Sequence, residues 1–224
     1  MLGLMVCLMA LLPFDGYADF VEYGSSQGTW TAQGKQLHSP WSAVYQYKLN
    51  YNETSASFTG SGTQEKPYLI IDEMDLCRLA IQVNDGTDFN GQYFKLMNDI
   101  DLAEHVWYPI GVKSDACFAG IFDGNNKTIK NMSIVLVDAD NTTTYAYGLF
   151  GHMKGAVRRL KMTDGYVEIN RTGSNQASML NVGLLCGTMS NDMSREIFGA
   201  VYECDIKGRI QGSVSNNFGS SFVG

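Results

Sequence analysis

The chain is a succession of short hydrophobic runs separated by turns rich in Gly and Asn, and one of these runs recurs. The run 147–151 (YGLFG) is echoed by 182–187 (VGLLCG) and, more faintly, by 221–224 (SFVG). The first glycines of the first two runs, Gly148 and Gly183, are 35 residues apart. A repeat of this length is typical of structural units that are too small to bury a core alone and become stable when they stack on their neighbours.

Runs with strand character dominate the chain from residue 91 onward. The strongest turn signal, Asp-Gly-Asn-Asn at 123–126, lies between two of them. The repeating unit is therefore a loop, a Gly-framed strand, a turn and an alternating strand, and insertions fall in the loops. The predicted strands are 67–71, 93–97, 100–102, 118–122, 128–134, 156–162 and 200–206.

One helix is predicted in this strand-rich chain, over 72–84. Asp72 is placed to cap its N-terminus, and acidic residues follow in the first turn, where the helix dipole favours negative charge. Leu76, Leu79 and Val83 recur at helical spacing, so the helix has one apolar face. Such a face needs a hydrophobic surface to cover, and the open end of a stack of β coils is one.

The N-terminus carries the features of an export signal. Residues 1–12 are uncharged, and their apolar core spans about 11 residues, too short to cross a bilayer. Gly-Tyr-Ala at 16–18 provides small residues for a signal peptidase, so we expect residues 1–18 to be a signal peptide and the mature chain to have no transmembrane segment. No Lys or Arg precedes the apolar run, so a buried N-terminal strand or helix is the alternative. Val6 before Cys7 does not fit a lipoprotein signal.

Residues 19–57 form an aromatic-rich segment whose role the sequence does not define. Its aromatic side chains suit either a platform that stacks on sugars or the inner face of a strand that packs on the neighbouring domain.

The composition of the chain argues against binding to nucleic acid. The chain has 224 residues, a formal charge of −7 and a pI near 4.9, and it lacks the basic stripe that nucleic-acid binding requires. The densest basic cluster, Lys154, Arg158, Arg159 and Lys161, is interpreted as a solvated face.

The spacing of the cysteines fits neither a zinc site nor a compact disulfide framework. After removal of the signal, Cys77, Cys117, Cys186 and Cys204 remain, with no CxxC pair. They are interpreted as small buried hydrophobic residues, with a bridge between Cys186 and Cys204 as the alternative.

The ordered series of phrases resembles the opening of many exported bacterial β-helix proteins. It begins with 58–70, continues through 93–102 and 107–129, and includes two copies similar to the GLUG motif, 148–151 and 183–187, the second with one inserted residue. The resemblance covers residues 58–224. It implies an all-β, right-handed parallel β-helix with an N-terminal capping α-helix, on large secreted or surface proteins that include adhesin-like proteins and the non-catalytic part of IgA1-specific metallopeptidases. It brings no catalytic residues to transfer.

Several structural expectations follow from this resemblance. The glycines of each repeated phrase are expected where chains approach too closely for a side chain. Gly224 falls inside the third phrase, so the chain is expected to be truncated at its C-terminus, with an uncovered last coil. The residues expected in the core are Ile121, Phe122, Leu149, Phe150, Leu184 and Leu185.

No motif in the chain assembles an active site. Asp99 and Asp101 could hold Ca²⁺ or a sugar, but a turn and an exposed strand residue explain them better. Asp123 begins the run Asp-Gly-Asn, and these are the residue types that a tight turn requires. His38, His105 and His152 are separate, and HExxH, GxSxG, GxGxxG and Walker motifs are missing, so no catalytic, cofactor or metal residues are predicted. Five Asn-x-Ser/Thr sites, at Asn52, Asn126, Asn131, Asn141 and Asn170, are interpreted as turn and ladder asparagines.

The leading hypothesis for function is a secreted or cell-surface scaffold that binds a glycan or a host or cell-surface protein without catalysis. A polysaccharide-degrading β-helix enzyme is the alternative, and it requires Asp99, Asp101, Arg158, Arg159 and Lys161 to converge in a groove. The stalk of a larger surface metallopeptidase is a third possibility, and it requires an HExxH motif outside this chain.

Overall fold

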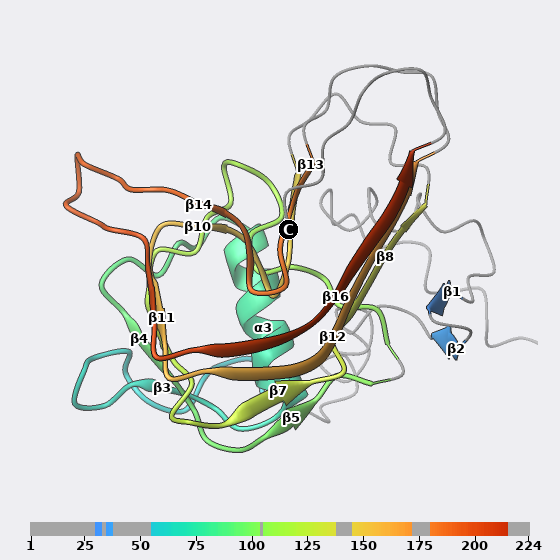
Figure 1. Ribbon diagram of the computed structural model, residues 1–224. Helices are drawn as coiled ribbons and strands as arrows, with labels where there is room; N and C mark the ends of the chain where they lie inside the picture. The colour runs from blue at the N-terminus through green and yellow to red at the C-terminus, as the bar shows by residue number, and fades with distance from the viewer. Residues whose placement is uncertain are drawn as a thin grey trace, which may run out of the picture.

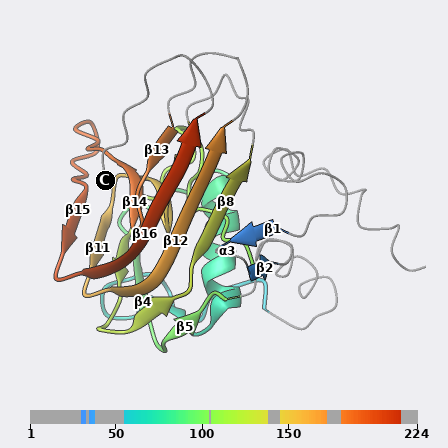
Figure 2. The ribbon, with the colours of Figure 1, turned by 45° about the vertical axis from the view of Figure 1, so that its right-hand side comes forward.

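The described chain is built mainly from short β-strands, which curl around a single described helix (Figures 1 and 2). This computed structural model describes residues 30–32, 35–37, 55–103, 105–137, 145–171 and 180–214. The predicted signal peptide 1–18, the third repeated phrase 221–224 and nearly all of segment 19–57 lie outside the described residues.

The elements follow one another in short steps from β3 onward. Before them, β1 (Trp30–Ala32) and β2 (Lys35–Leu37) form an antiparallel pair. The remaining elements are β3 (Tyr68–Ile70), α3 (Glu73–Asn84), β4 (Tyr93–Leu96), β5 (Ile100–Asp101), β6 (Ile121–Asp123), β7 (Thr128–Lys130), β8 (Ser133–Val137), β9 (Tyr145–Tyr147), β10 (Phe150–Met153), β11 (Ala156–Arg158), β12 (Lys161–Arg171), β13 (Leu180–Val182), β14 (Cys186–Met189), β15 (Ala200–Tyr202) and β16 (Asp205–Val214).

From β3 onward every named strand pair is parallel, and partners come from successive repeats. One sheet has the order β15-β11-β6-β4-β3, and a second has the order β16-β12-β7-β5, with β8 also beside β12. Two smaller sheets pair β10 with β14 and β9 with β13. The chain therefore passes through several sheets and returns one layer further on, which produces a curled parallel sheet. Parallel pairing also requires such long connections, because a tight hairpin can join only antiparallel strands.

Three predicted strands are each interrupted by a residue in the left-handed backbone region. The predicted run 156–162 divides into β11 and β12 at Arg159, whose φ is 52°, and 200–206 divides at Glu203, whose φ is 56°. The run 128–134 divides at Asn131, with a φ of 59°. Alternation of polar and apolar residues continues across such a corner, so the hydrophobic pattern alone does not reveal it.

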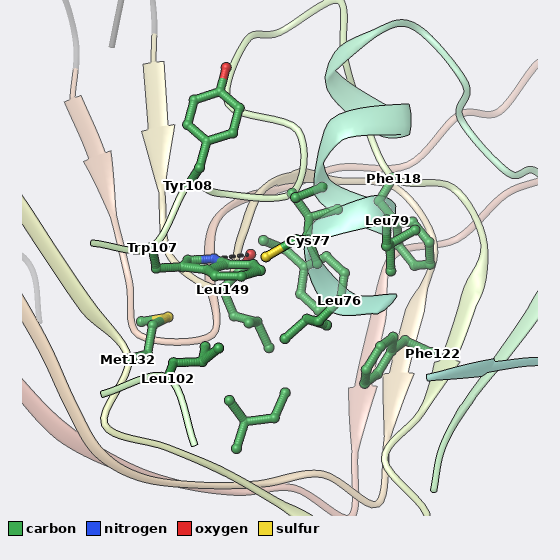
Figure 3. Packing of buried hydrophobic residues seen from close by; sticks show 14 of the residues in the cluster. Leu76, Cys77, Leu79, Leu102, Trp107, Tyr108, Phe118, Phe122, Met132 and Leu149 are labelled. Carbon is green, nitrogen blue, oxygen red and sulfur yellow. Dashed lines mark hydrogen bonds between the residues drawn. The ribbon is translucent and has the colours of Figure 1, made fainter. Parts of the chain in front are cut away.

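The core is built from rows of side chains that repeat at matching positions of successive strands. Phe94, Phe122 and Val157 are register partners and are completely buried. Figure 3 shows Phe118, Phe122 and Leu149 among the buried side chains that surround the helix. In the same cluster the buried Trp107 indole donates a hydrogen bond to the Leu149 carbonyl at 3.1 Å. This bond removes the cost of burying an unpaired N–H group.

The predicted helix and its N-terminal capping residue, Asp72, are confirmed by α3. The Asp72 carboxylate accepts hydrogen bonds from the Met74 and Asp75 amides, at 3.0 and 3.1 Å. Leu76 and Leu79 are fully buried and face the core (Figure 3). At the other end the Asn84 side chain donates to the Pro109 carbonyl and accepts from the Val112 amide. These bonds fasten the C-terminal end of the helix to the segment between β5 and β6.

The repeated glycines lie at close approaches between chain segments, as predicted. A Cβ atom on Gly148 would lie 2.7 Å from the Gly183 carbonyl oxygen, and one on Gly151 would lie 2.2 Å from the oxygen of Gly111. The corresponding distances are 2.2 Å at Gly183, to the Cys186 oxygen, and 2.6 Å at Gly187, to a backbone nitrogen. Space, rather than a positive φ, therefore requires glycine in these phrases.

Core predictions are confirmed in part. Phe122, Leu149 and Phe150 are completely buried. Ile121 is partly exposed, because side chains alternate along a strand and it precedes the inward-facing Phe122. Leu184 and Leu185 are only partly buried, although they pack against the core.

The predicted alternative of a Cys186–Cys204 bridge is wrong. Cys77, Cys117, Cys186 and Cys204 form no disulfide bond, and Cys77 is buried on the helix as expected. Cys186 lies in β14 and donates to the Thr188 carbonyl at 3.0 Å, whereas Cys204 lies at the corner between β15 and β16 and donates to the Tyr202 carbonyl at 3.4 Å. Each thiol is thus satisfied by a backbone oxygen of its own segment.

Candidate binding surface

Charged and aromatic side chains that could bind a ligand form one row on the outer face of the sheet that contains β4, β6, β11 and β15. Lys95, Asp123, Arg158 and Tyr202 are register partners in these four strands. They follow the core row of Phe94, Phe122 and Val157 by one residue, so alternation directs them away from the core. Figure 2 shows β11 and β15 side by side, at the end of this sheet.

Asp123 is the centre of this row, and only 5% of its surface is exposed. Its carboxylate accepts bonds from Arg158 Nε and Arg159 Nε, both at 3.0 Å, and forms ion pairs with both guanidinium groups. The Asn125 amide donates to it at 2.8 Å. Two arginines on one carboxylate make a charge-assisted clamp between neighbouring coils.

Burial alone would raise the pKa of Asp123, because the charged form loses water. Hydrogen bonds from Arg159 and the Asn125 amide, together with the charges of Arg158 and Arg159, outweigh this and lower its pKa below the usual value. Asp123 is therefore ionised at neutral pH and has its oxygens occupied. A carboxylate in this state is unsuited to act as a general acid or base.

The corner after β11 aims Arg159 at Asp123. Arg159 has a left-handed backbone, which is uncommon for a residue with a side chain. Its amide donates to the Tyr202 carbonyl of the next layer at 3.2 Å, and its carbonyl accepts from the Asn126 amide of the previous layer at 2.8 Å. The corners of three layers are thus stacked by main-chain bonds, which fixes the position of the Arg159 side chain.

Tyr202 completes the row at its exposed end. Tyr202 is 44% exposed, and its hydroxyl is 3.5 Å from Arg158 Nη1. The hydrogen bond with Tyr202, followed by the charge of Asp123, raises the pKa of Arg158 above its already high usual value. The row and the adjacent Arg159 therefore combine two permanently charged guanidinium groups with an accessible aromatic ring.

Asp99 and Asp101 belong to the other five-stranded sheet and make local contacts. Asp101 accepts from the Asn131 side chain at 2.8 Å and forms an ion pair with Lys130 at 3.4 Å. Asp99 accepts from the Thr128 amide at 2.8 Å. Both are partners of the next strand along the ladder, which agrees with a turn residue and an exposed strand residue.

The five residues required by the degrading-enzyme alternative are not brought together. Arg158 and Arg159 pair with Asp123, and within the described residues neither forms an ion pair with Asp99 or Asp101. Lys161 is an exposed residue of β12 whose register partners are Thr128 and Asp205. Sequence reasoning assigned Asp123 only to a turn. The signal it missed was that Arg158 follows Asp123 by 35 residues, the same spacing that separates the repeated glycines.

A second ionic cluster fastens the loop between β14 and β15. Arg195 forms ion pairs with Asp88 and Asp192, and Lys154 lies 3.6 Å from Asp192. The pKa of Asp192 is lowered, first by the Ser194 hydrogen bond and then by Arg195. This cluster joins segments that are far apart in sequence, so its evident effect is to hold the loop.

The histidines occupy separate places, and His38 lies outside the described residues. His152 is buried in β10, and His105 lies between β5 and β6. Across the part of the chain that the structure describes, no three His, Cys, Asp or Glu side chains are grouped to hold a metal ion. In the same part of the chain no helix has the length and apolar character needed to cross a bilayer.

Comparison with known proteins gives partial matches. No family model matches the chain. It is 29% identical over 161 residues to a protein named as a Gly-rich membrane protein of Evansella cellulosilytica, and 33% identical over 156 residues to halomucin of Haloquadratum walsbyi. The matches cover 65% and 64% of this chain but only 17% and 2% of those proteins. A solved structure named as an immunoglobulin A1 protease from Bacteroides ovatus has a TM-score of 0.47 and 21% identity over 67% of this chain and 40% of that one.

Proposed function

We propose that this chain is a non-catalytic scaffold, secreted or displayed at the cell surface, that binds a glycan or a cell-surface protein. The observation that carries the proposal is the Asp123 clamp. The most deeply buried carboxylate of the outer face is neutralised by two arginines from the next layer, so it serves to order a surface rather than to transfer protons.

The scaffold is proposed to be a right-handed parallel β-helix of the GLUG type, capped by α3. Parallel pairing of strands about one repeat apart supports the β-helix, because in that fold each turn of the chain returns to the same position one layer further on. Right-handed crossover connections are the general rule for parallel strands. The burial of Leu76 and Leu79 against the strand layers supports the capping role of α3.

The proposed location rests on the predicted signal peptide and on the relatives. One relative is named as a membrane protein, which supports a place at the cell surface. This chain spans less than a fifth of that relative and a smaller part of halomucin, so the functions of those whole proteins are not transferred here.

The test is a glycan and cell-surface protein array, run with the purified chain beside a screen for polysaccharide degradation. We expect retention of at least one ligand and no turnover of any polysaccharide. Turnover that is lost in Asp101→Ala or Arg158→Ala variants with unchanged thermal unfolding would replace the scaffold by an enzyme. Absence of any ligand on the array would also count against the proposal.

A further inference from the structure

The outer row offers a ligand hydrogen-bond donors and few acceptors. The acceptors of the row are already engaged: the Asp123 oxygens accept from Arg158, Arg159 and the Asn125 amide, and the Tyr202 hydroxyl accepts from Arg158 at 3.5 Å. Lys95 and the two arginines supply N–H groups alone. Neutral sugars require both donors and acceptors, whereas a carboxylate only accepts. The chemistry of the row therefore favours a ligand that carries carboxylate groups.

Arg159 presents an accessible donor beside the row, and its side chain is more exposed than that of Arg158. Its Nε and one Nη bind Asp123, and within the described residues its Nη1 has no hydrogen-bond partner. The side chain is 37% exposed. Because Asp123 already holds the guanidinium plane in place, little side-chain entropy remains to be lost when a second carboxylate binds its free edge.

The charge near this edge is positive although the chain as a whole carries −7. Lys95, Arg158 and Arg159 face two carboxylates, those of Asp123 and of Glu203, which lies within electrostatic range of Arg159. Tyr202 lies beside Arg158 and exposes its ring. Aromatic rings of this kind pack on the apolar faces of sugars, and a neighbouring guanidinium adds a bond to a charged substituent.

We propose that the outer face of β6, β11 and β15 binds an acidic polysaccharide, with a uronate carboxylate on Arg159 and a sugar ring on Tyr202. This inference rests on the proposed function and specifies its ligand class. Charge complementarity and the excess of N–H donors over unengaged acceptors favour this ligand over a neutral glycan.

Affinity electrophoresis of the full chain in gels containing polygalacturonate or neutral dextran tests the proposal. Arg159→Gln leaves Asp123 paired with Arg158, and Lys207→Gln removes the same charge from an exposed residue of β16. We expect Arg159→Gln to weaken polygalacturonate binding roughly tenfold, the loss of one charged hydrogen bond, and Lys207→Gln to leave it unchanged. Tyr202→Ala should weaken it several-fold, whereas Phe198→Ala, which also removes an exposed ring, should not.

The outcomes separate this inference from the proposed function. Equal polygalacturonate affinities of Arg159→Gln and Lys207→Gln would overturn the inference, as would retention by dextran alone. If the array finds a neutral glycan or a protein ligand instead, the scaffold stands and the acidic ligand fails. Thermal unfolding of each variant verifies the fold, and Arg159→Lys, which keeps the charge but not the planar fork, should restore part of the affinity.

Discussion

An interior layer and the last described layer place the same kinds of residue in the same register but bury them differently. Val157 in β11 is completely buried, whereas its partner Val201 in β15 is 41% exposed. Likewise Met162 in β12 is 1% exposed, and its partner Ile206 in β16 is only partly buried. Hydrophobic alternation therefore specifies which side chains point inward, whereas the next layer is what buries them.

Apolar side chains in the first layers are buried more fully, because α3 packs against them. Helix α3 places Leu76 and Leu79 against the strand layers, and Phe94 and Leu96 in β4 are completely buried. Within the described residues β15 and β16 are each paired along one edge only. Apolar residues of equal character therefore contribute unequally to stability at the two places.

The largest expected effect comes from placing one charge at matched positions. Val157→Asp buries an unpaired carboxylate and should lower the free energy of unfolding by roughly 4 kcal/mol. Val201→Asp, at a partly exposed position, should lower it by about 1 kcal/mol or less. Urea unfolding followed by circular dichroism measures both. Equal losses would show that the layer of β15 is covered as fully as that of β11.

A smaller difference is expected between two glycines. Gly151→Ala places a methyl group 2.2 Å from a backbone oxygen of the neighbouring layer, which cannot move without shifting a strand, so we expect a loss of about 1–3 kcal/mol. At Gly165 the nearest atom is a Leu184 side-chain methyl 3.2 Å away, which can turn aside, so Gly165→Ala should change stability by roughly 0.5 kcal/mol. Thermal unfolding of the pair is the measurement, and a larger loss at Gly165 would contradict the backbone explanation.

The smallest effect concerns acid stability. The pKa of Asp123 is lower in the folded chain than in the unfolded chain. The stabilisation it provides is therefore complete above the unfolded pKa of about 4 and is lost as the pH falls through the folded value. Urea unfolding between pH 7 and about pH 3 should show this loss in the natural sequence and a shallower slope in Asp123→Asn. Parallel slopes would mean that the Asp123 clamp does not contribute.

Local signals predicted much of this fold, whereas contacts between layers were harder to foresee. Asp72 and the helix it caps follow from residues within one turn of each other. The repeated glycines were identified from spacing alone. The corner at Arg159 and the clamp on Asp123 depend on a neighbouring layer 35 residues away, and their residue types also suit an exposed strand and a tight turn. Burial of Leu184 and Leu185 was overestimated for the same reason, because it depends on the layer beyond them.

The ladder between β12 and β16 has a mechanical consequence. It is the longest ladder among the described strands, with register pairs from Lys161 with Asp205 to Arg171 with Val214, and it is interrupted only near Gly165. A force perpendicular to the strands that pulls one end of β16 away from β12 breaks these main-chain hydrogen bonds one after another. A force parallel to the strands loads many of them at the same time. The last described layer should therefore resist sliding along its neighbour far better than peeling away from it.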